Sequence, residues 1–116
     1  MHLWAVECPP CIAEFPLLRK FLDSLRSMPQ VKAVLVSETV DLNKLLTFLR
    51  DNRSIVPQLP HYQIGDDRLR GSLQNFSQPT TLLIDERGIV RQAFLGSIKS
   101  RRSELADAVQ RLLKAM

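Results

Sequence analysis

The spacing of apolar residues in the first third of the chain predicts a strand, a helix and a second strand. Residues 1–6 are apolar at almost every position, which is typical of a short strand buried on both faces. From residue 9 to about residue 28, apolar side chains recur at spacings of four and three, as on one face of an amphipathic helix. Residues 31–36 are rich in valine and predict a buried parallel strand.

The middle of the chain predicts a second helix followed by an irregular connector. This helix is expected to begin at Asp41 and to end near residues 51–53, with its leucines on one face. Two prolines in residues 54–65 predict a connector that contains a short extended piece at 61–64. Residues 66–76 have the spacing of a short helix.

The last third predicts a hairpin and a final helix. Residues 80–85 and 89–95 are expected to be antiparallel strands, because Gly88 supplies the positive φ that their turn needs. Ser100 is placed to cap a helix whose apolar face carries Leu105, Val109, Leu112 and Met116. The predicted order is therefore β-α-β-α, a connector with a short helix, and then β-β-α.

Length and composition favour one domain and exclude some classes of function. The 116 residues suffice for a single two-layer core, and 45% apolar with 6% aromatic residues means that leucine, valine and isoleucine must fill it. The net charge of +4 is spread along the chain, which argues against a dedicated nucleic-acid surface. No apolar stretch reaches the roughly 18 residues that cross a bilayer, and the N-terminus lacks the layout of a signal peptide.

Two cysteines, Cys8 and Cys11, point to redox chemistry. They stand three positions apart at the start of a helical pattern, with Pro9 at the first helical position. A thiol at a helix N-terminus faces free backbone N–H groups and the positive end of the helix dipole, which favour the thiolate. Because the thiolate is the nucleophile of disulfide exchange, this position activates Cys8. We expect Cys8 to be an exposed cap residue, with Cys11 one turn inward and close enough for the sulfurs to bond.

Two other interpretations of the cysteine pair are weaker. A structural zinc site needs four ligands, and the further candidates His2 and His61 are not spaced as a ligand pair. A purely structural disulfide would close a very short loop and so remove little chain entropy. A reactive dithiol that needs no metal or cofactor fits better, although two cysteines alone do not fix the compartment.

Two separated blocks of sequence carry a resemblance to a known family. The first is Trp4-Ala5-x-x-Cys8-Pro9-Pro10-Cys11-x-x-Glu14-x-Pro16, and the second is Pro79-Thr80-Thr81-Leu82-Leu83-Ile84-Asp85-x-x-Gly88. Together they resemble the thioredoxin superfamily, in particular the membrane-tethered, extracytoplasmic thiol–disulfide oxidoreductases of the TlpA and ResA type. A CxxC pair alone is a weak signal, whereas both blocks in order, with the expected elements between them, are a strong one.

The resemblance implies an α/β thioredoxin fold. Its central mixed sheet would have four strands in the order 2-1-3-4, with the third strand antiparallel and helices on both faces. Residues 1–116 would form a single thioredoxin-like domain. Family members usually have extra strands before the Trp-Ala motif, so we expect this domain to be truncated at its N-terminus, with a sheet edge exposed or covered by another element.

The resemblance also implies roles for the residues of the first block. Cys8 matches the exposed attacking cysteine and Cys11 the buried resolving one, which act through a mixed disulfide. Pro9 and Pro10 lie where the family sets its redox potential, and neither proline supplies an N–H group to the cysteines. Trp4 is expected beneath the active-site turn, with ordinary packing in the core as the alternative.

Three further residues and Glu14 complete the implied site. Pro79 matches the cis-proline beside the disulfide, the alternative being a trans-proline that merely opens a strand. The backbone of Gln78 is expected to pair with an extended substrate strand, and Thr80 belongs to the same substrate-binding segment. Glu14 matches a glutamate that accepts protons near the dithiol, the alternative being a solvated carboxylate on the helix surface.

Two residues depart from the family pattern. Glu7 stands where an aromatic residue commonly precedes the first cysteine, and a carboxylate there would raise the pKa of Cys8 unless it is well solvated. His2 stands six positions before Cys8, where thioredoxins often keep a buried carboxylate as proton acceptor. A histidine could do similar work, since it titrates near neutrality, but a residue so close to the terminus is expected to fray.

The predicted function is that of a thiol–disulfide oxidoreductase acting on protein substrates through Cys8 and Cys11. By resemblance, its setting is extracytoplasmic, in the periplasm or at the outer face of the membrane, where it would reduce apocytochrome or other protein disulfides. Its partners would be those substrates, a second redox protein that recycles the dithiol, and a membrane tether outside this segment. Two alternatives remain: a metallochaperone that holds a soft ion such as Cu(I) between the cysteines, and a redox-inert interaction module.

Overall fold

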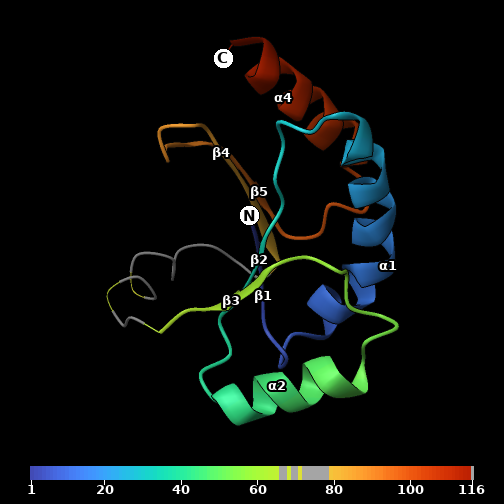
Figure 1. Cartoon of the computed structure of the whole chain (residues 1–116), viewed down its shortest axis with the longest axis vertical. Helices are drawn as coiled ribbons and strands as arrows, with labels where there is room; N and C mark the ends of the chain where they lie inside the picture. The colour runs from blue at the N-terminus through green and yellow to red at the C-terminus, as the bar shows by residue number, and fades with distance from the viewer. Residues whose placement is uncertain (66–67, 69–70, 72–78, 116) are drawn as a thin grey trace.

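The fold alternates short strands with longer helices, as Figure 1 shows. The computed structural model describes residues 1–65, 68, 71 and 79–115. Its helices and strands, in chain order, are β1 (His2–Trp4), α1 (Pro9–Ser24) with the short 3-10 helix η1 (Leu25–Ser27), β2 (Leu35–Ser37), α2 (Leu42–Asp51), β3 (His61–Gln63), β4 (Thr80–Ile84), β5 (Val90–Leu95) and α4 (Arg102–Ala115).

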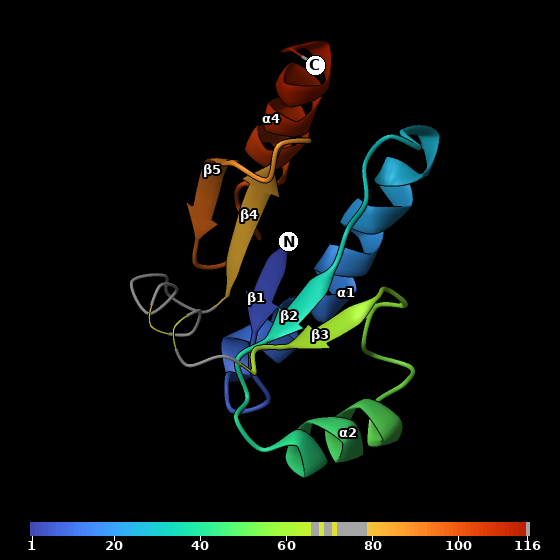
Figure 2. The same cartoon turned by 60° about the vertical axis from the view of Figure 1, so that its left-hand side comes forward.

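The strands form one mixed sheet in the order β3-β2-β1-β4-β5. Figure 2 shows them side by side, with β1 in the middle. β1 pairs in parallel with β2, and β2 with β3, whereas β4 runs antiparallel to both β1 and β5. The thioredoxin fold and the order of the four expected strands are confirmed, but the predicted strand count is wrong. The extended piece in the connector pairs with the free edge of β2 and becomes a fifth strand.

Several predicted boundaries differ from the structure; the first strand ends at Trp4 and α1 ends at Ser24. The strand expected at 31–36 starts only at Leu35, because the pairing with β1 begins where Leu35 lies opposite His2. The last helix starts at Arg102, and the carbonyl of Arg101 accepts the Leu105 N–H, so Ser100 lies too early to be its cap. Most of the predicted helix at 66–76 lies outside the described residues.

The main core lies on one face of the sheet, where three helices pack against the strands. It unites buried side chains of β1, α1, β2, α2, β5 and α4 with the two cysteines; among them are Trp4, Phe15, Leu18, Leu35, Leu45, Phe94 and Leu105. β1 is central in this sheet, so its side chains are covered on both faces, as the continuous apolar run predicts.

A smaller cluster lies on the opposite face of the sheet. It comprises Leu3, Val36, Ile64 and Leu82, with Met1, Val34, Ile84 and Ala93 packed around them. Within the described part of the chain, none of its members comes from a helix, so helices on this second face remain a prediction. No helix of the described residues is both long and apolar enough to cross a membrane.

The hairpin between β4 and β5 forms as the sequence predicts. Gly88 has a φ of 81°, in the region that glycine adopts without strain. The Asp85 carboxylate accepts the backbone N–H groups of Arg87 and Ile89 and a bond from the Arg91 side chain. These bonds lower the pKa of Asp85, the one from the Ile89 backbone most.

Leu105→Ala tests the assignment of the main core. The Leu105 side chain is fully buried, so its truncation should lower the free energy of unfolding by about 2–5 kcal/mol. Leu46→Ala is the matched control, because Leu46 also lies in a helix but is 53% exposed, and should change stability by less than about 0.5 kcal/mol. Urea denaturation followed by circular dichroism measures both, and equal losses would contradict the placement of the core.

Candidate active site

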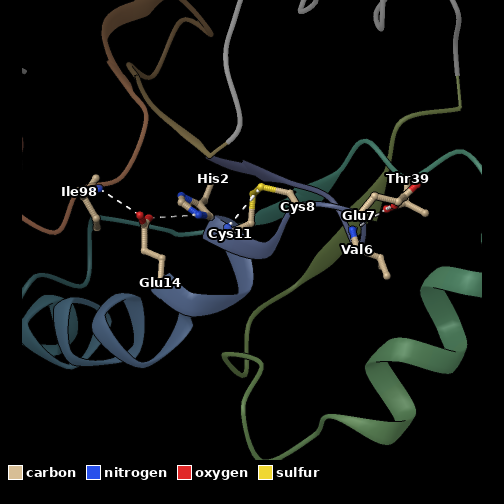
Figure 3. Close-up of a disulfide and its surroundings, with 8 residues drawn as sticks. All are labelled: His2, Val6, Glu7, Cys8, Cys11, Glu14, Thr39 and Ile98. Carbon is tan, nitrogen blue, oxygen red and sulfur yellow. Dashed lines mark hydrogen bonds and ion pairs between the residues drawn. A yellow bond between two sulfur atoms is a disulfide. The ribbon is translucent and has the colours of Figure 1, made fainter.

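The cysteine pair lies where the chain leaves the central strand and enters the first helix. After β1 the chain makes a short loop, and α1 begins at Pro9, directly behind Cys8. Cys8 is the N-cap of α1 with an extended backbone, and its sulfur is bonded to that of Cys11. Figure 3 shows this disulfide at the start of the helix. The predicted cap position of Cys8 and the predicted pairing are therefore confirmed.

One backbone N–H group is aimed at the sulfur of Cys8. The Cys11 N–H lies 3.3 Å from Cys8 Sγ, and it also bonds the Cys8 carbonyl at 3.0 Å. Pro9 and Pro10 occupy the first two helical positions and have no N–H group, so Cys11 carries the first donor of the helix. Because the helix dipole adds positive potential here, a thiolate formed at Cys8 is stabilised by Cys11 itself.

Both cysteines belong to the main core, and they differ in access. Cys8 is 8% exposed and Cys11 is fully buried. The expectation of an exposed Cys8 is thus not met in the oxidised state, although Cys8 is the more accessible sulfur. Trp4 is fully buried in the same cluster and meets Phe15 edge-on, with ring centroids 5.1 Å apart. Trp4 was expected either beneath the active-site turn or in the ordinary core. Both descriptions apply, because the core cluster that contains Trp4 also contains the disulfide.

Glu14 is buried, so its interpretation as a solvated surface carboxylate is wrong. It lies one turn after Cys11 on the inward face of α1 and is 4% exposed. Its Oε2 accepts the Ile98 N–H at 3.1 Å. Burial raises the pKa of Glu14, and hydrogen bonds from Ser97 and Ile98 oppose this only in part. A buried carboxyl of raised pKa takes up a proton more readily than a solvated one, which suits it to proton transfer.

His2 faces Glu14 from the central strand, as Figure 3 shows, so the expectation of a frayed terminus is wrong. Its Nε2 lies 3.6 Å from Glu14 Oε1, and its Nδ1 lies 2.9 Å from the Thr81 hydroxyl. His2 and Thr81 are direct partners in the β1–β4 register, which accounts for this contact. Burial lowers the pKa of His2 to about 4, and its imidazole is therefore neutral near pH 7.

Glu7 is turned away from the disulfide by a contact with the segment before α2. Its Oε1 accepts the Thr39 hydroxyl at 2.9 Å, and its Oε2 lies 3.7 Å from Lys44 Nζ. The Thr39 hydroxyl oxygen also accepts the Val6 N–H at 2.8 Å. The bond from Thr39 and the charge of Lys44 lower the pKa of Glu7. Its negative charge is thus partly compensated, which limits the effect on Cys8 that the sequence led us to expect.

The second sequence block begins at the same end of the sheet. Thr80 pairs with Leu3, so the preceding residue Pro79 lies beside Trp4, where the chain departs toward Cys8. Pro79 and Thr80 are both fully buried. Gln78 lies outside the described residues. The substrate-binding role of this segment and the cis form of Pro79 remain predictions.

A groove lies beside the start of α1. Its volume is about 400 Å³, and its walls include Pro10, Glu14, Ser97 and Lys99. Glu14 thus borders this groove, although its side chain is almost completely buried. Within the described part of the chain, no three His, Cys, Asp or Glu side chains cluster as metal ligands.

Sequence reasoning missed the hydroxyl groups that hold this site together. Thr81 stands in the second block, and its pairing with His2 follows from the sheet order once the register is known. Thr39 carries no signal in the sequence, because its role depends on how the loop before α2 packs against Val6.

Thr39→Val tests the link between the active-site loop and α2. Thr39 is 1% exposed, and its loss would leave the partly buried Val6 N–H without this partner. We expect the free energy of unfolding to fall by about 1–3 kcal/mol. Thr47→Val is the matched control, since Thr47 is exposed on α2 and should change stability little. Equal effects in urea denaturation would contradict the link.

The burial of His2 predicts a pH-dependent stability. Unfolded chains hold a proton on this histidine below pH 6.5, whereas the folded chain holds it only below about pH 4. Between these values unfolding takes up a proton at this histidine, so the contribution of His2 to the free energy of unfolding should rise with pH, by at most about 3 kcal/mol. His2→Gln should lack this rise in urea denaturation of the oxidised protein from pH 4 to pH 7. Parallel curves for the two proteins would contradict the buried, neutral His2.

The comparisons with known proteins agree with the fold and the motif. No protein-family model matches the chain. It is 28% identical over 115 residues to the thiol:disulfide interchange protein DsbE of Vibrio cholerae, and 24% identical over 105 residues to the thioredoxin-like protein YneN of Bacillus subtilis. These alignments cover 97% and 90% of the chain. The chain spans 59% of the length of each relative.

Solved structures support the same fold. A DsbE-type thiol:disulfide interchange protein of Chlorobium tepidum superposes with a TM-score of 0.75 at 21% identity, over 97% of this chain and 77% of the other. StoA of Bacillus subtilis gives a TM-score of 0.68 at 23% identity, over 91% of this chain and 77% of the other. These structures show that the chain has a thioredoxin-like fold, and with its CxxC pair at the start of α1 it is similar to the thiol:disulfide interchange protein DsbE.

Proposed function

We propose that the protein is a thiol–disulfide oxidoreductase that exchanges disulfides with protein substrates through Cys8 and Cys11. The observation that carries the proposal is the position of Cys8, which caps α1 with its sulfur facing the Cys11 N–H. This position stabilises a thiolate, and it also makes Cys8 the less buried sulfur of the pair. The likeness to DsbE of Vibrio cholerae supports the same class of reaction.

The reaction runs in two steps of disulfide exchange. In the reduced protein, the Cys8 thiolate attacks one sulfur of a substrate disulfide, forms a mixed disulfide and expels the other substrate sulfur as a thiolate. Cys11 then loses its proton and attacks Cys8 Sγ, which closes the intramolecular disulfide and releases the second substrate thiolate. Two electrons pass to the substrate, whose thiolates take up protons. A separate redox protein reduces the Cys8–Cys11 disulfide again.

Glu14 is the group that we assign to the proton of Cys11. It lies one turn after Cys11 on the same face of the helix, and it is the buried carboxyl of α1. Its raised pKa makes the carboxylate a competent acceptor, and its side chain borders the groove beside the start of α1. Pro79 and Thr80, with Gln78 before them, are the segment against which we expect an extended substrate strand to bind.

The proposed setting is extracytoplasmic, with reduction of protein disulfides during the maturation of c-type cytochromes or of other exported proteins. The names of DsbE and StoA, two of the matched proteins, suggest this setting. A tether to the membrane outside the segment described is part of the proposal. Equilibration with glutathione buffers tests the direction of electron flow, since a potential near about −270 mV marks a reductant and one near about −120 mV an oxidant.

Two cysteine variants test the reaction itself. Cys8→Ser should reduce insulin turnover with dithiothreitol to the uncatalysed rate, because no nucleophile remains at the helix N-terminus. Cys11→Ser is the matched control, since it keeps the attacking sulfur but cannot resolve it, and should accumulate a mixed disulfide detected by mass spectrometry. Full turnover in Cys8→Ser would overturn the proposal. Retention of Cu(I) by the reduced wild-type protein without any turnover would select the metallochaperone instead.

A further inference from the structure

A buried polar contact between the central strand and α1 is not explained by the thiol chemistry alone. His2 Nε2 and Glu14 Oε1 are both shielded from water, and neither has a hydrogen-bond partner within the described residues. They face each other at 3.6 Å, as the dashed line in Figure 3 shows. Two buried acceptors cannot satisfy one another, so this pair becomes satisfied only when one of the two atoms carries a proton and their 3.6 Å separation closes to hydrogen-bond length.

The other nitrogen of His2 has a partner that can reverse its role. Nδ1 lies 2.9 Å from the hydroxyl of Thr81, which is itself buried at 7% exposure. A hydroxyl group can donate or accept, whereas each nitrogen of a neutral imidazole does only one of these. The neutral ring therefore has two satisfied arrangements. Either Thr81 donates to Nδ1 and Nε2–H donates to Glu14, or Nδ1–H donates to Thr81 and Glu14 donates to Nε2.

These two arrangements differ by one proton. In the first, Glu14 is a carboxylate, and in the second it is a carboxylic acid, while His2 is neutral in both. The neutral ring is the form that its burial favours, since the pKa of His2 falls to about 4 while that of Glu14 is raised. The geometry points to a role for His2 as a tautomer switch, which lets Glu14 gain or lose one proton while every buried polar atom of the triad His2, Glu14 and Thr81 keeps a partner.

This inference rests on the proposed function and adds a positioning residue to it. Before resolution of the mixed disulfide, Cys11 and Nε2 each hold a proton; afterwards Glu14 and Nδ1 each hold one, and the Thr81 hydroxyl has turned. One nitrogen of the ring therefore releases a proton while the other takes one up, and His2 is neutral in both end states. If the imidazole kept its proton on Nε2, the O–H of a protonated Glu14 and the Nε2–H group would be two donors facing each other. This unfavourable contact would oppose protonation of Glu14.

Few other ionisable groups approach the triad. The amino group of Met1 on the same strand donates to the Leu82 carbonyl and does not bond the imidazole. Ser97, next to the Ile98 N–H, bonds Glu14 from the segment before α4. Lys20 of α1 and Lys99 line the groove that Glu14 borders. Among the described residues, these are the titratable and charged groups that a pH titration of the triad must consider.

Nuclear magnetic resonance of the oxidised wild-type protein tests the switch directly. With ¹⁵N-labelled histidine and ¹³C-labelled glutamate, we expect His2 to pass from the Nε2–H to the Nδ1–H tautomer at the pH where the Glu14 carboxyl becomes protonated. His61 is the internal control. It lies on β3, and β2 separates it from His2, so its signals should not follow the protonation of Glu14. Protonation of Glu14 with the His2 signals unchanged, or with a doubly protonated His2, would overturn the inference.

A matched pair of variants at Thr81 supplies a second test. Thr81→Val removes the partner of Nδ1 in both arrangements, and it leaves an unpaired buried N–H group in the protonated one. Orphaned buried N–H groups are the rarer kind in proteins, so Glu14 should titrate at a lower pH in Thr81→Val than in the wild type. Thr81→Ser keeps the hydroxyl and should titrate like the wild type. The resolving step, measured as decay of the mixed disulfide at neutral pH, should slow in Thr81→Val and not in Thr81→Ser. Identical titrations in both variants would overturn the switch.

These outcomes separate the inference from the function that it extends. Insulin turnover by the wild-type protein, without a tautomer change at His2, would leave the oxidoreductase intact and remove the role of His2. Loss of turnover in every protein would overturn the function instead. The wild-type spectra decide the matter even if Thr81→Val does not fold.

Discussion

The structure depends on one constraint: the central strand of the sheet must deliver its last residues to the start of a helix. β1 is covered on both faces and has neighbours on both edges, so its position is fixed by packing as well as by hydrogen bonds. The loop that follows it is therefore constrained, and Cys8 is held at the N-terminus of α1, where the Cys11 N–H faces its sulfur. The proposed redox reactivity is a property of this junction and not of the sulfur alone.

The same junction places polar groups inside the core. His2 on β1 and Glu14 on α1 face each other at 3.6 Å between the sheet and the helix, and Glu14 follows the buried Cys11 by one turn. Burying such groups opposes folding, because a carboxylate or an imidazolium loses its hydration there. A protein selected only for stability would gain from apolar residues at both positions. The proton transfer that we propose gives a reason for their presence next to a cysteine pair.

Much of this arrangement was predictable from local sequence patterns. The cysteine spacing, Pro9 and the helical period locate the N-cap of α1, and Gly88 locates the hairpin. The fifth strand was foreseen only as an extended piece, since three residues that are mostly exposed have no periodic signal and owe their structure to the edge of β2. The burial of His2 could not be predicted, because it depends on contacts with β4, which is distant in sequence. The burial of Glu14 could be predicted only with knowledge of which face of α1 packs against the sheet.

One consequence of the sheet order concerns biosynthesis. β1 leaves the ribosome well before its antiparallel neighbour β4, because His2 and Thr81 are separated by 79 residues. Contacts of such long sequence separation form late and slowly, since the loop that they close is large. The nascent chain thus carries an apolar strand with one unpaired edge until β4 has been synthesised. Chaperones that shield unpaired strand edges would engage β1 during this interval.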